Sequence, residues 1–169
     1  LDLQFKLEKL NEKYIKEFPL SNPFIVACEN GCLDDVLFFI KTRNIYNAFV
    51  TEDDKKTIIS LKEFINKPGK DSAGIDGCTS LILASQHEHV DLVTYLLCNF
   101  KSEIDLKLVD KHGRNVLHVS AHDNKMNKNT LEVLLTHSTL DIINKQSKLG
   151  LTPLDQLYDC NNSKIKDEL

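Results

Sequence analysis

The feature that most constrains this chain is a short motif that returns at a nearly constant interval. Each copy has a glycine, one variable residue, a Thr or Asn, and an apolar residue two places later: Gly77-Cys78-Thr79-Ser80-Leu81, Gly113-Arg114-Asn115-Val116-Leu117 and Gly150-Leu151-Thr152-Pro153-Leu154. The glycines are 36 and then 37 residues apart. A fixed period of this length is typical of repeat proteins, in which each unit buries its apolar face against the next one. The chain is therefore expected to be a stack of similar units.

Each copy begins with residues that favour the start of a helix. The glycine suits a turn that needs a positive φ. Residues of N-cap type follow each glycine and also open an earlier, degenerate copy: Thr79, Asn115, Thr152 and Asn22. Pro23 and Pro153 take the first helical position in their copies. Small residues then follow, as at Ala84-Ser85 and Ser120-Ala121, and let neighbouring helices approach closely.

A second helix is expected in each of the first three copies. Its inward stripe consists of apolar residues at helical spacing: Val36, Phe39 and Ile40, then Val90, Val93, Leu96 and Leu97, then Leu131, Leu134 and Leu135. After the later two stripes, an extended segment is expected at 104–106 and at 142–144. Each unit is thus predicted to be a helix, a turn, a second helix and a projecting hairpin-like loop, which we call a finger.

These motifs resemble those of the ankyrin-repeat family. Residues 85–97 are similar to the second half of an ankyrin repeat, and Gly113-Arg114-Asn115-Val116-Leu117-His118 is similar to the family's Gly-x-Thr-Pro-Leu-His segment. The resemblance covers residues 22–169 and implies an all-α ankyrin-repeat solenoid of stacked helix-turn-helix units with finger loops. It places repeats near 22–44, 77–106, 113–143 and 150–169. It also implies a structural role for His118, which in the family hydrogen-bonds within and between repeat turns.

One interval departs from the period. The first and second cap residues are 57 residues apart, and the surplus follows the second helix of the first copy. We expect an insertion near 45–66 with a helix over 52–65, because Thr51 is an N-cap type followed by acidic residues. A lengthened finger is expected after it, at 67–74. Insertions in repeat proteins often lie on the binding face, although drift in a tolerant loop explains the extra length equally well.

The two ends of the chain also differ from the inner copies. Residues 1–21 carry an amphipathic helical pattern through Leu3, Leu7, Leu10, Tyr14 and Phe18. This pattern suits a helix that caps the exposed side of the first repeat, and binding of a partner by this helix is the alternative. In the last copy Leu157-Tyr158 replaces the small pair, which fits poorly against a further stacked unit. The opening residue Leu1, in place of Met, indicates a piece of a longer protein.

Composition argues against several classes of function. The formal net charge is −4, and Lys alternates with Asp and Glu without a basic stripe for a nucleic-acid backbone. The sequence has no apolar run of membrane-spanning length and no secretory signal. The final Lys166-Asp167-Glu168-Leu169 spells a retrieval signal of the endoplasmic reticulum, which we interpret as a coincidence. Five cysteines, scattered along the chain, suit reduced thiols of an intracellular protein, cytoplasmic or nuclear.

No catalytic or metal-binding pattern stands out in the sequence. Cys28 and Cys32 lie one helical turn apart without the second ligand pair that a zinc site needs. The acidic pairs at 34–35 and 53–54 are interpreted as helix-start charges. No phosphate loop, dinucleotide motif or nucleophile triad is recognisable. We therefore expect no enzyme activity, no metal and no cofactor.

The resemblance also implies where a partner binds, because ankyrin proteins use the finger tips and the exposed face of the first helices, which line a concave groove. Carried over by register, the partner-binding residues are Lys70, Asp71, Gln86, His87, Asp110, Lys111, His112, Arg114, His122, Asp123 and Lys148. Ile75, Asp76, Leu149, Glu29 and Asn30 lie at matching positions. The surface is mixed in charge. Its histidines form a candidate cluster that titrates at about pH 6.5, the alternative being ordinary solvated side chains.

The expected function is a protein–protein interaction scaffold that binds another protein through this concave surface and is a monomer in isolation. No nucleic acid is expected as a partner, and no insertion into a membrane. Two alternatives stay open. In the first alternative, the chain is a regulatory ankyrin module of a larger enzyme or membrane protein. In the second, it is a self-assembly unit that stacks through an apolar end formed by Leu157, Tyr158, Ile165 and Leu169.

Overall fold

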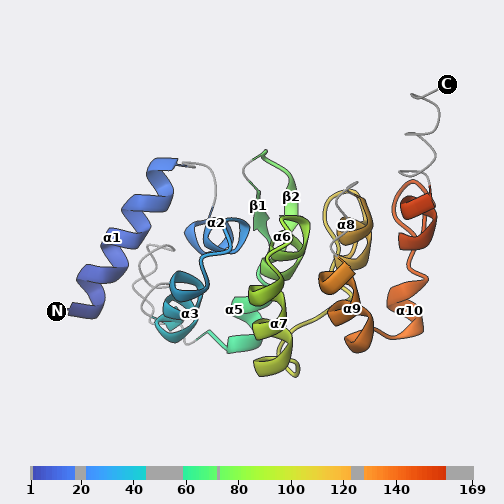
Figure 1. Ribbon diagram of the computed structural model, residues 1–169. Coiled ribbons are helices and arrows are strands. Elements are labelled where there is room, and N and C mark those ends of the chain that lie inside the picture. Colours follow the sequence, from blue (N-terminus) through green and yellow to red (C-terminus); the bar gives the residue numbers. More distant parts are fainter. Residues whose placement is uncertain (1, 18–21, 45–58, 72, 123–127, 159–169) are drawn as a thin grey trace.

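The structure is a computed structural model, and it describes residues 2–17, 22–44, 59–71, 73–122 and 128–158. Over these ranges the chain forms a row of helix pairs, with the first helices in one layer and the second helices in another (Figure 1). The pairs are α2 (Pro23–Glu29) with α3 (Leu33–Lys41), α6 (Ser80–Gln86) with α7 (Val90–Asn99), and α8 (Val116–His122) with α9 (Lys128–His137). This arrangement is the all-α solenoid that the motif spacing predicts.

The residues that start each unit act as the sequence predicts. All four predicted N-cap side chains accept a hydrogen bond from a backbone N–H of the first helical turn: Asn22, Thr79, Asn115 and Thr152. The motif glycines all have a positive φ, of 84° at Gly77, 74° at Gly113 and 77° at Gly150. The last cap opens a helical segment at 153–158. The second helix expected for that copy lies outside the described residues.

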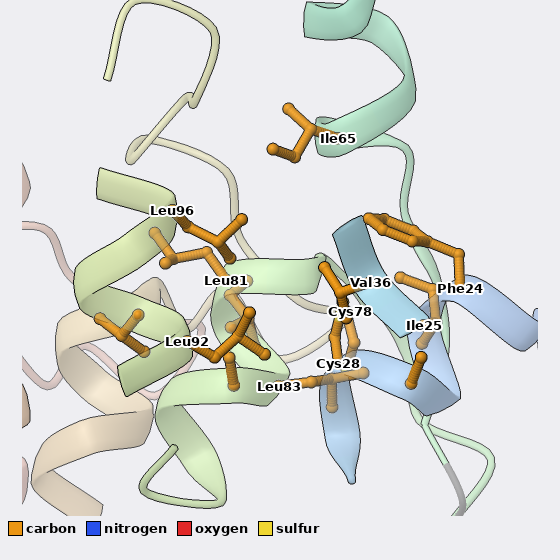
Figure 2. Close-up of a cluster of buried hydrophobic side chains, with 14 of the residues drawn as sticks. Phe24, Ile25, Cys28, Val36, Ile65, Cys78, Leu81, Leu83, Leu92 and Leu96 are labelled. Carbon is orange, nitrogen blue, oxygen red and sulfur yellow. The ribbon is translucent and has the colours of Figure 1, made fainter. Parts of the chain in front are cut away.

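The core runs along the row, between the two layers of helices. The first helices are almost wholly buried, and in α6 every residue from Ser80 to Ser85 is buried. The small residues Ala27 and Ala84 are fully buried where α2 and α6 pack together, as the close approach of these helices requires. Figure 2 shows side chains of α2, α6 and α7 meeting in this core, among them Cys28, Leu83 and Leu92.

The N-terminal helix α1 (Asp2–Glu17) packs against α2, on the side away from α6 (Figure 1). Leu7 and Tyr14 are buried there, as the amphipathic pattern predicts. The prediction is wrong at Leu3, whose side chain is 51% exposed, because the first turn of α1 lies outside the contact with the first unit. Phe18 lies outside the described residues.

The insertion near 45–66 differs from the prediction in the part that is described. Its helix is α5 (Leu61–Asn66), and Ile59 and Ser60 before it are not helical, so a single helix over 52–65 is wrong. The physical reason is the cap: the Ser60 hydroxyl accepts a hydrogen bond of 3.1 Å from the backbone N–H of Glu63. Residues 45–58 lie outside the described part of the chain.

The third unit also departs from the prediction at two places. Residues 140–143 form a short helix, α10 (Leu140–Ile143), rather than an extended segment, because the Thr139 carbonyl accepts the N–H groups of Ile142 and Ile143 at 3.0 Å. Leu135 is 42% exposed instead of buried. Its counterpart in the preceding copy, Leu97, is covered because α9 packs against α7. The described part of the chain ends before the helix that would cover α9 in the same way.

The fingers project beside the first helices. The first finger is a hairpin of β1 (Gly69–Lys70) and β2 (Asp76–Cys78), which pair antiparallel (Figure 1). The second and third fingers are tight turns, closed by a backbone hydrogen bond from Asp110 to Arg114 and by one from Ser147 to Leu151, both of 2.9 Å. The fold therefore lines up three fingers along one edge of the solenoid.

Candidate partner-binding surface

The three fingers are joined to one another by main-chain hydrogen bonds. The N–H of Lys111 donates to the carbonyl of Asp76, and the N–H of Lys148 donates to the carbonyl of His112, both at 2.9 Å. Asp76 and His112 each stand directly before a motif glycine, so the two bonds are the same contact repeated one unit further on. The fingers consequently form a continuous row in which each is positioned by the one before it.

The motif glycines make this close contact possible. A Cβ on Gly77 would lie 3.1 Å from backbone atoms of Asp110, and a Cβ on Gly113 would lie 3.0 Å from the backbone nitrogen of Lys148. Both positions also have a φ that L-residues with a side chain rarely adopt. Gly150 shares the φ but has nothing within 4 Å of the corresponding position. The glycines thus serve the turn in all three fingers and the finger-to-finger contact in the first two.

Asp110 is buried, which corrects its expected place on the exposed surface. One carboxylate oxygen accepts the backbone N–H groups of His112 and Arg114 at 2.8 and 3.0 Å. The other accepts both the Nε and an Nη of Arg114 at 2.7 Å. The side chain of Asp110 is 0% exposed and that of Arg114 is 17% exposed. This ion pair stabilises the second finger. Both side chains are largely buried, so they offer little surface to a partner.

Asp71 is the second correction of the same kind. It is 3% exposed, and its Oδ1 accepts the backbone N–H of Ile75 at 2.6 Å. An aspartate at the start of a turn folds back onto backbone N–H groups that the turn leaves unpaired, and this removes it from the surface. The sequence contains the signal, since both aspartates stand three residues before a glycine, at Gly74 and Gly113.

The other predicted finger residues are exposed: Lys70, Lys111, His112 and Lys148. Lys70 lies 3.7 Å from the carboxylate of Asp76, which is also exposed. Leu149, at the tip of the third finger, is 84% exposed. Of the finger residues predicted to bind a partner, three lysines and one histidine are therefore exposed, with Asp76 and Leu149 exposed beside them.

The predicted residues of α6 lie at its C-terminal end, whereas the first finger leads into its N-terminal end at Thr79. His87, at the C-cap of α6, has a side chain that is 40% exposed, and its Nε2 lies 3.5 Å from a carboxylate oxygen of Glu29. His87 also stacks on His89 with 6.2 Å between ring centroids. Gln86 is half-buried. Of the remaining predicted residues, Asp123 lies outside the described part of the chain, and the structure does not describe the side chain of His122. The proposed histidine cluster therefore stays a prediction.

Two further histidines link consecutive units, as sequence reasoning expected for His118. His118 is fully buried; its Nε2 lies 3.0 Å from the carbonyl of Leu151 in the next unit, and its Nδ1 lies 2.6 Å from Oδ1 and 3.2 Å from the backbone N of Asn115. Burial lowers the pKa of His118, because an imidazolium is poorly solvated there. His89 bridges the first two units in the same manner, with Nε2 2.6 Å from the carbonyl of Glu29.

Outside the finger row, the described residues show few features of an active site or a metal site. A hollow of about 310 Å³ lies between the second and third units, with Leu97, Ile104 and Ile142 in its lining and the exposed Lys107–Asp141 ion pair at its edge. Among the described residues no group of three His, Cys, Asp or Glu side chains is placed to hold a metal ion. Burial raises the pKa of the Cys78 thiol to about 12, which favours the protonated, unreactive form of this thiol. No described helix is long and apolar enough to span a membrane.

The paired helices and the hydrogen-bonded row of fingers define a helical-repeat solenoid. A family model described as ankyrin repeats (3 copies) matches residues 10–146, and the chain belongs to the ankyrin-repeat family. No curated protein matches the chain. Ankyrin repeats are generally modules for protein–protein interaction.

Proposed function

We propose that this chain is a protein-interaction module that binds a partner protein through the finger row and the exposed residues of the first helices. The proposal rests on how the fingers are joined in the row. Main-chain hydrogen bonds fix each finger on its neighbour, while the side chains of Lys111, His112 and Lys148 remain exposed. A surface that is already ordered loses less conformational entropy when it binds, and this favours recognition.

In this proposal the chain acts by binding alone, without catalysis or a cofactor, in the cytoplasm or nucleus. The sequence supports the first point, because it has no recognisable catalytic motif. The cysteines support a location in the cytoplasm or nucleus. Their odd number and scattered positions suit a reducing compartment, and the four described cysteines, Cys28, Cys32, Cys78 and Cys98, are free thiols.

The experiment that tests the proposal is affinity capture with a matched pair of variants. The finger variant carries Lys111→Ala, His112→Ala and Lys148→Ala, which are all exposed. Arg114 is left in place, because its loss would leave the Asp110 carboxylate buried without its cation. The control variant carries Lys41→Ala, Lys62→Ala and Lys101→Ala, which are equally exposed but lie outside the finger row.

We expect wild type and control to retain the same partner, quantified by mass spectrometry, and the finger variant to lose it. Circular dichroism and thermal unfolding show whether all three proteins are folded. If the folded finger variant keeps every partner that the control keeps, the chain binds through another surface and the proposal is wrong.

A further inference from the structure

The charge of the finger loops is opposite to that of the whole chain. Residues 67–78, 107–114 and 144–151 contain seven Lys and Arg and three Asp, a net charge of +4, whereas the chain has a net charge of −4. The remainder of the chain therefore carries −8. The sequence order hides this contrast, because acidic and basic residues alternate along the fingers.

Burial removes two acidic side chains of the fingers from the surface and one basic side chain, Arg114, which pairs with Asp110. Two of the three aspartates, Asp71 and Asp110, are 3% and 4% exposed and accept backbone N–H groups of their own turns. The third, Asp76, is paired with Lys70. Lys111 and Lys148 are exposed at equivalent positions of two neighbouring fingers. The exposed charged side chains at these two tips are therefore basic, although the sequence there is mixed.

The positions of these two lysines are fixed by the fold. The backbone N–H of each lysine is bonded to the preceding finger, at Asp76 and at His112. Leu149 follows Lys148 and is 84% exposed, which places an apolar side chain beside the second cation. The tips thus present two exposed lysines on a fixed backbone, with one exposed apolar side chain next to the second.

We propose that the partner segment that lies along the fingers is an acidic stretch of protein, with carboxylates against Lys111 and Lys148 and an apolar side chain against Leu149. This inference rests on the proposed function, since it names the chemistry of the partner at the same surface. Complementary charge across an interface raises the association rate and selects the partner.

Nucleic acid is the other polyanion that a basic row attracts, and the structure favours it less. Backbone recognition relies on many phosphate contacts, whereas the lysines of the fingers lie on a chain of net charge −4. Proteins that bind single strands also stack bases on aromatic rings, and the three finger loops contain no Phe, Tyr or Trp.

The test uses the full chain and a library of random short peptides displayed on phage. Peptides are selected on wild type, and the affinity of the strongest binder is measured by fluorescence anisotropy against two variants. The finger variant is Lys111→Glu with Lys148→Glu, and the control is Lys62→Glu with Lys101→Glu. Both variants have a net charge of −8, so a difference between them reports position and not total charge.

We expect the selected peptides to be rich in Asp and Glu with an apolar residue. The finger variant should weaken their binding by at least about tenfold while the control leaves it within about twofold. A peptide with its acids changed to Lys should prefer the finger variant to wild type. Added salt should weaken the wild-type complex.

Other outcomes separate this inference from the proposed function. If the selected peptides were neutral or basic and still depended on the fingers, the inference of an acidic partner would be wrong. Binding through the finger row would remain supported. Acidic peptides that bind the finger variant as well as the control would overturn both. Selection of no peptide overturns the inference, because a linear acidic segment would then not suffice. An oligonucleotide of thymidines that binds wild type more tightly than any selected peptide, and depends on the same lysines, would assign the row to nucleic acid instead.

Discussion

The backbone N–H of Lys148 donates a hydrogen bond of 2.9 Å to the carbonyl of His112, and this bond joins the third finger to the second. The N–H of Lys111 makes the same bond to Asp76 one unit earlier. Because both bonds use the main chain alone, they place the side chains of these residues at the surface without engaging them. The stability of the row and its chemistry can therefore be changed separately.

Gly113→Ala should destabilise the protein more than Gly150→Ala. Both glycines have a φ near that of a left-handed turn, which costs alanine about 1 kcal/mol. At Gly113 the new Cβ would also lie 3.0 Å from the backbone of Lys148, whereas at Gly150 nothing lies within 4 Å. We expect about 2–3 kcal/mol at Gly113 and about 1 kcal/mol at Gly150, from urea unfolding. Equal losses would show that the finger-to-finger contact contributes nothing.

Arg114→Ala should lower the free energy of unfolding by about 2–3 kcal/mol, because it leaves a buried carboxylate without its cation. Lys111→Ala, in the same finger but exposed, should change the free energy by less than about 0.5 kcal/mol. Urea unfolding of both variants measures the contrast. If Arg114→Ala left the free energy of unfolding unchanged, Asp110 would be hydrated in solution. The burial described for this ion pair would then be wrong.

Much of this framework can be predicted from sequence, because its determinants are local. A positive φ requires glycine, and an N-cap requires a short side chain with an acceptor, so both appear at fixed positions in each copy. The structure confirms these positions, including the degenerate Asn22. The structural role of His118 was also predictable, through resemblance of Gly113-Arg114-Asn115-Val116-Leu117-His118 to a known motif.

The errors arise where two local signals compete or where burial depends on a neighbour. Thr51 and Ser60 are both good helix caps, and Ser60, with Glu63 three residues on, is the one that starts α5. Leu135 has the periodicity of a core residue, but its burial depends on a helix that packs against α9. Asp110 is predicted from the sequence to be exposed. The prediction fails because its partners are backbone groups that come together only when the turn closes in the folded chain.

His118 should make the protein less stable in acid. Burial holds its folded pKa below the ordinary histidine value of about 6.5, so the unfolded chain binds more protons as the pH falls. The contribution of this histidine is therefore complete above about pH 6.5 and is lost below it, at no more than about 1.4 kcal/mol per pH unit. We expect His118→Gln to show a shallower loss of unfolding free energy than wild type between pH 7.5 and 5.5. Parallel curves would contradict the assignment.

Tyr14→Phe should loosen the N-terminal helix. The Tyr14 hydroxyl donates a hydrogen bond of 2.6 Å to Asp35, and its ring packs 6.2 Å from that of Phe39. The variant keeps the ring and loses the hydrogen bond, at a cost of about 1 kcal/mol. Hydrogen exchange of the α1 amides should speed up, whereas Tyr95→Phe, where the ring packs beside Phe100, should leave α1 unchanged. Equal exchange in both variants would show that the Tyr14–Asp35 hydrogen bond does not hold α1 in place.

The most direct test of the binding account is a map of the bound surface. The partner recovered by affinity capture would be added to isotope-labelled chain, and the amide chemical shifts would be followed by NMR. If the finger row is the binding surface, the largest changes fall on the fingers, at Lys111, His112 and Lys148, and at the C-terminal end of α6 near His87. Changes confined to α3, α7 and α9, with the finger amides unmoved, would contradict it.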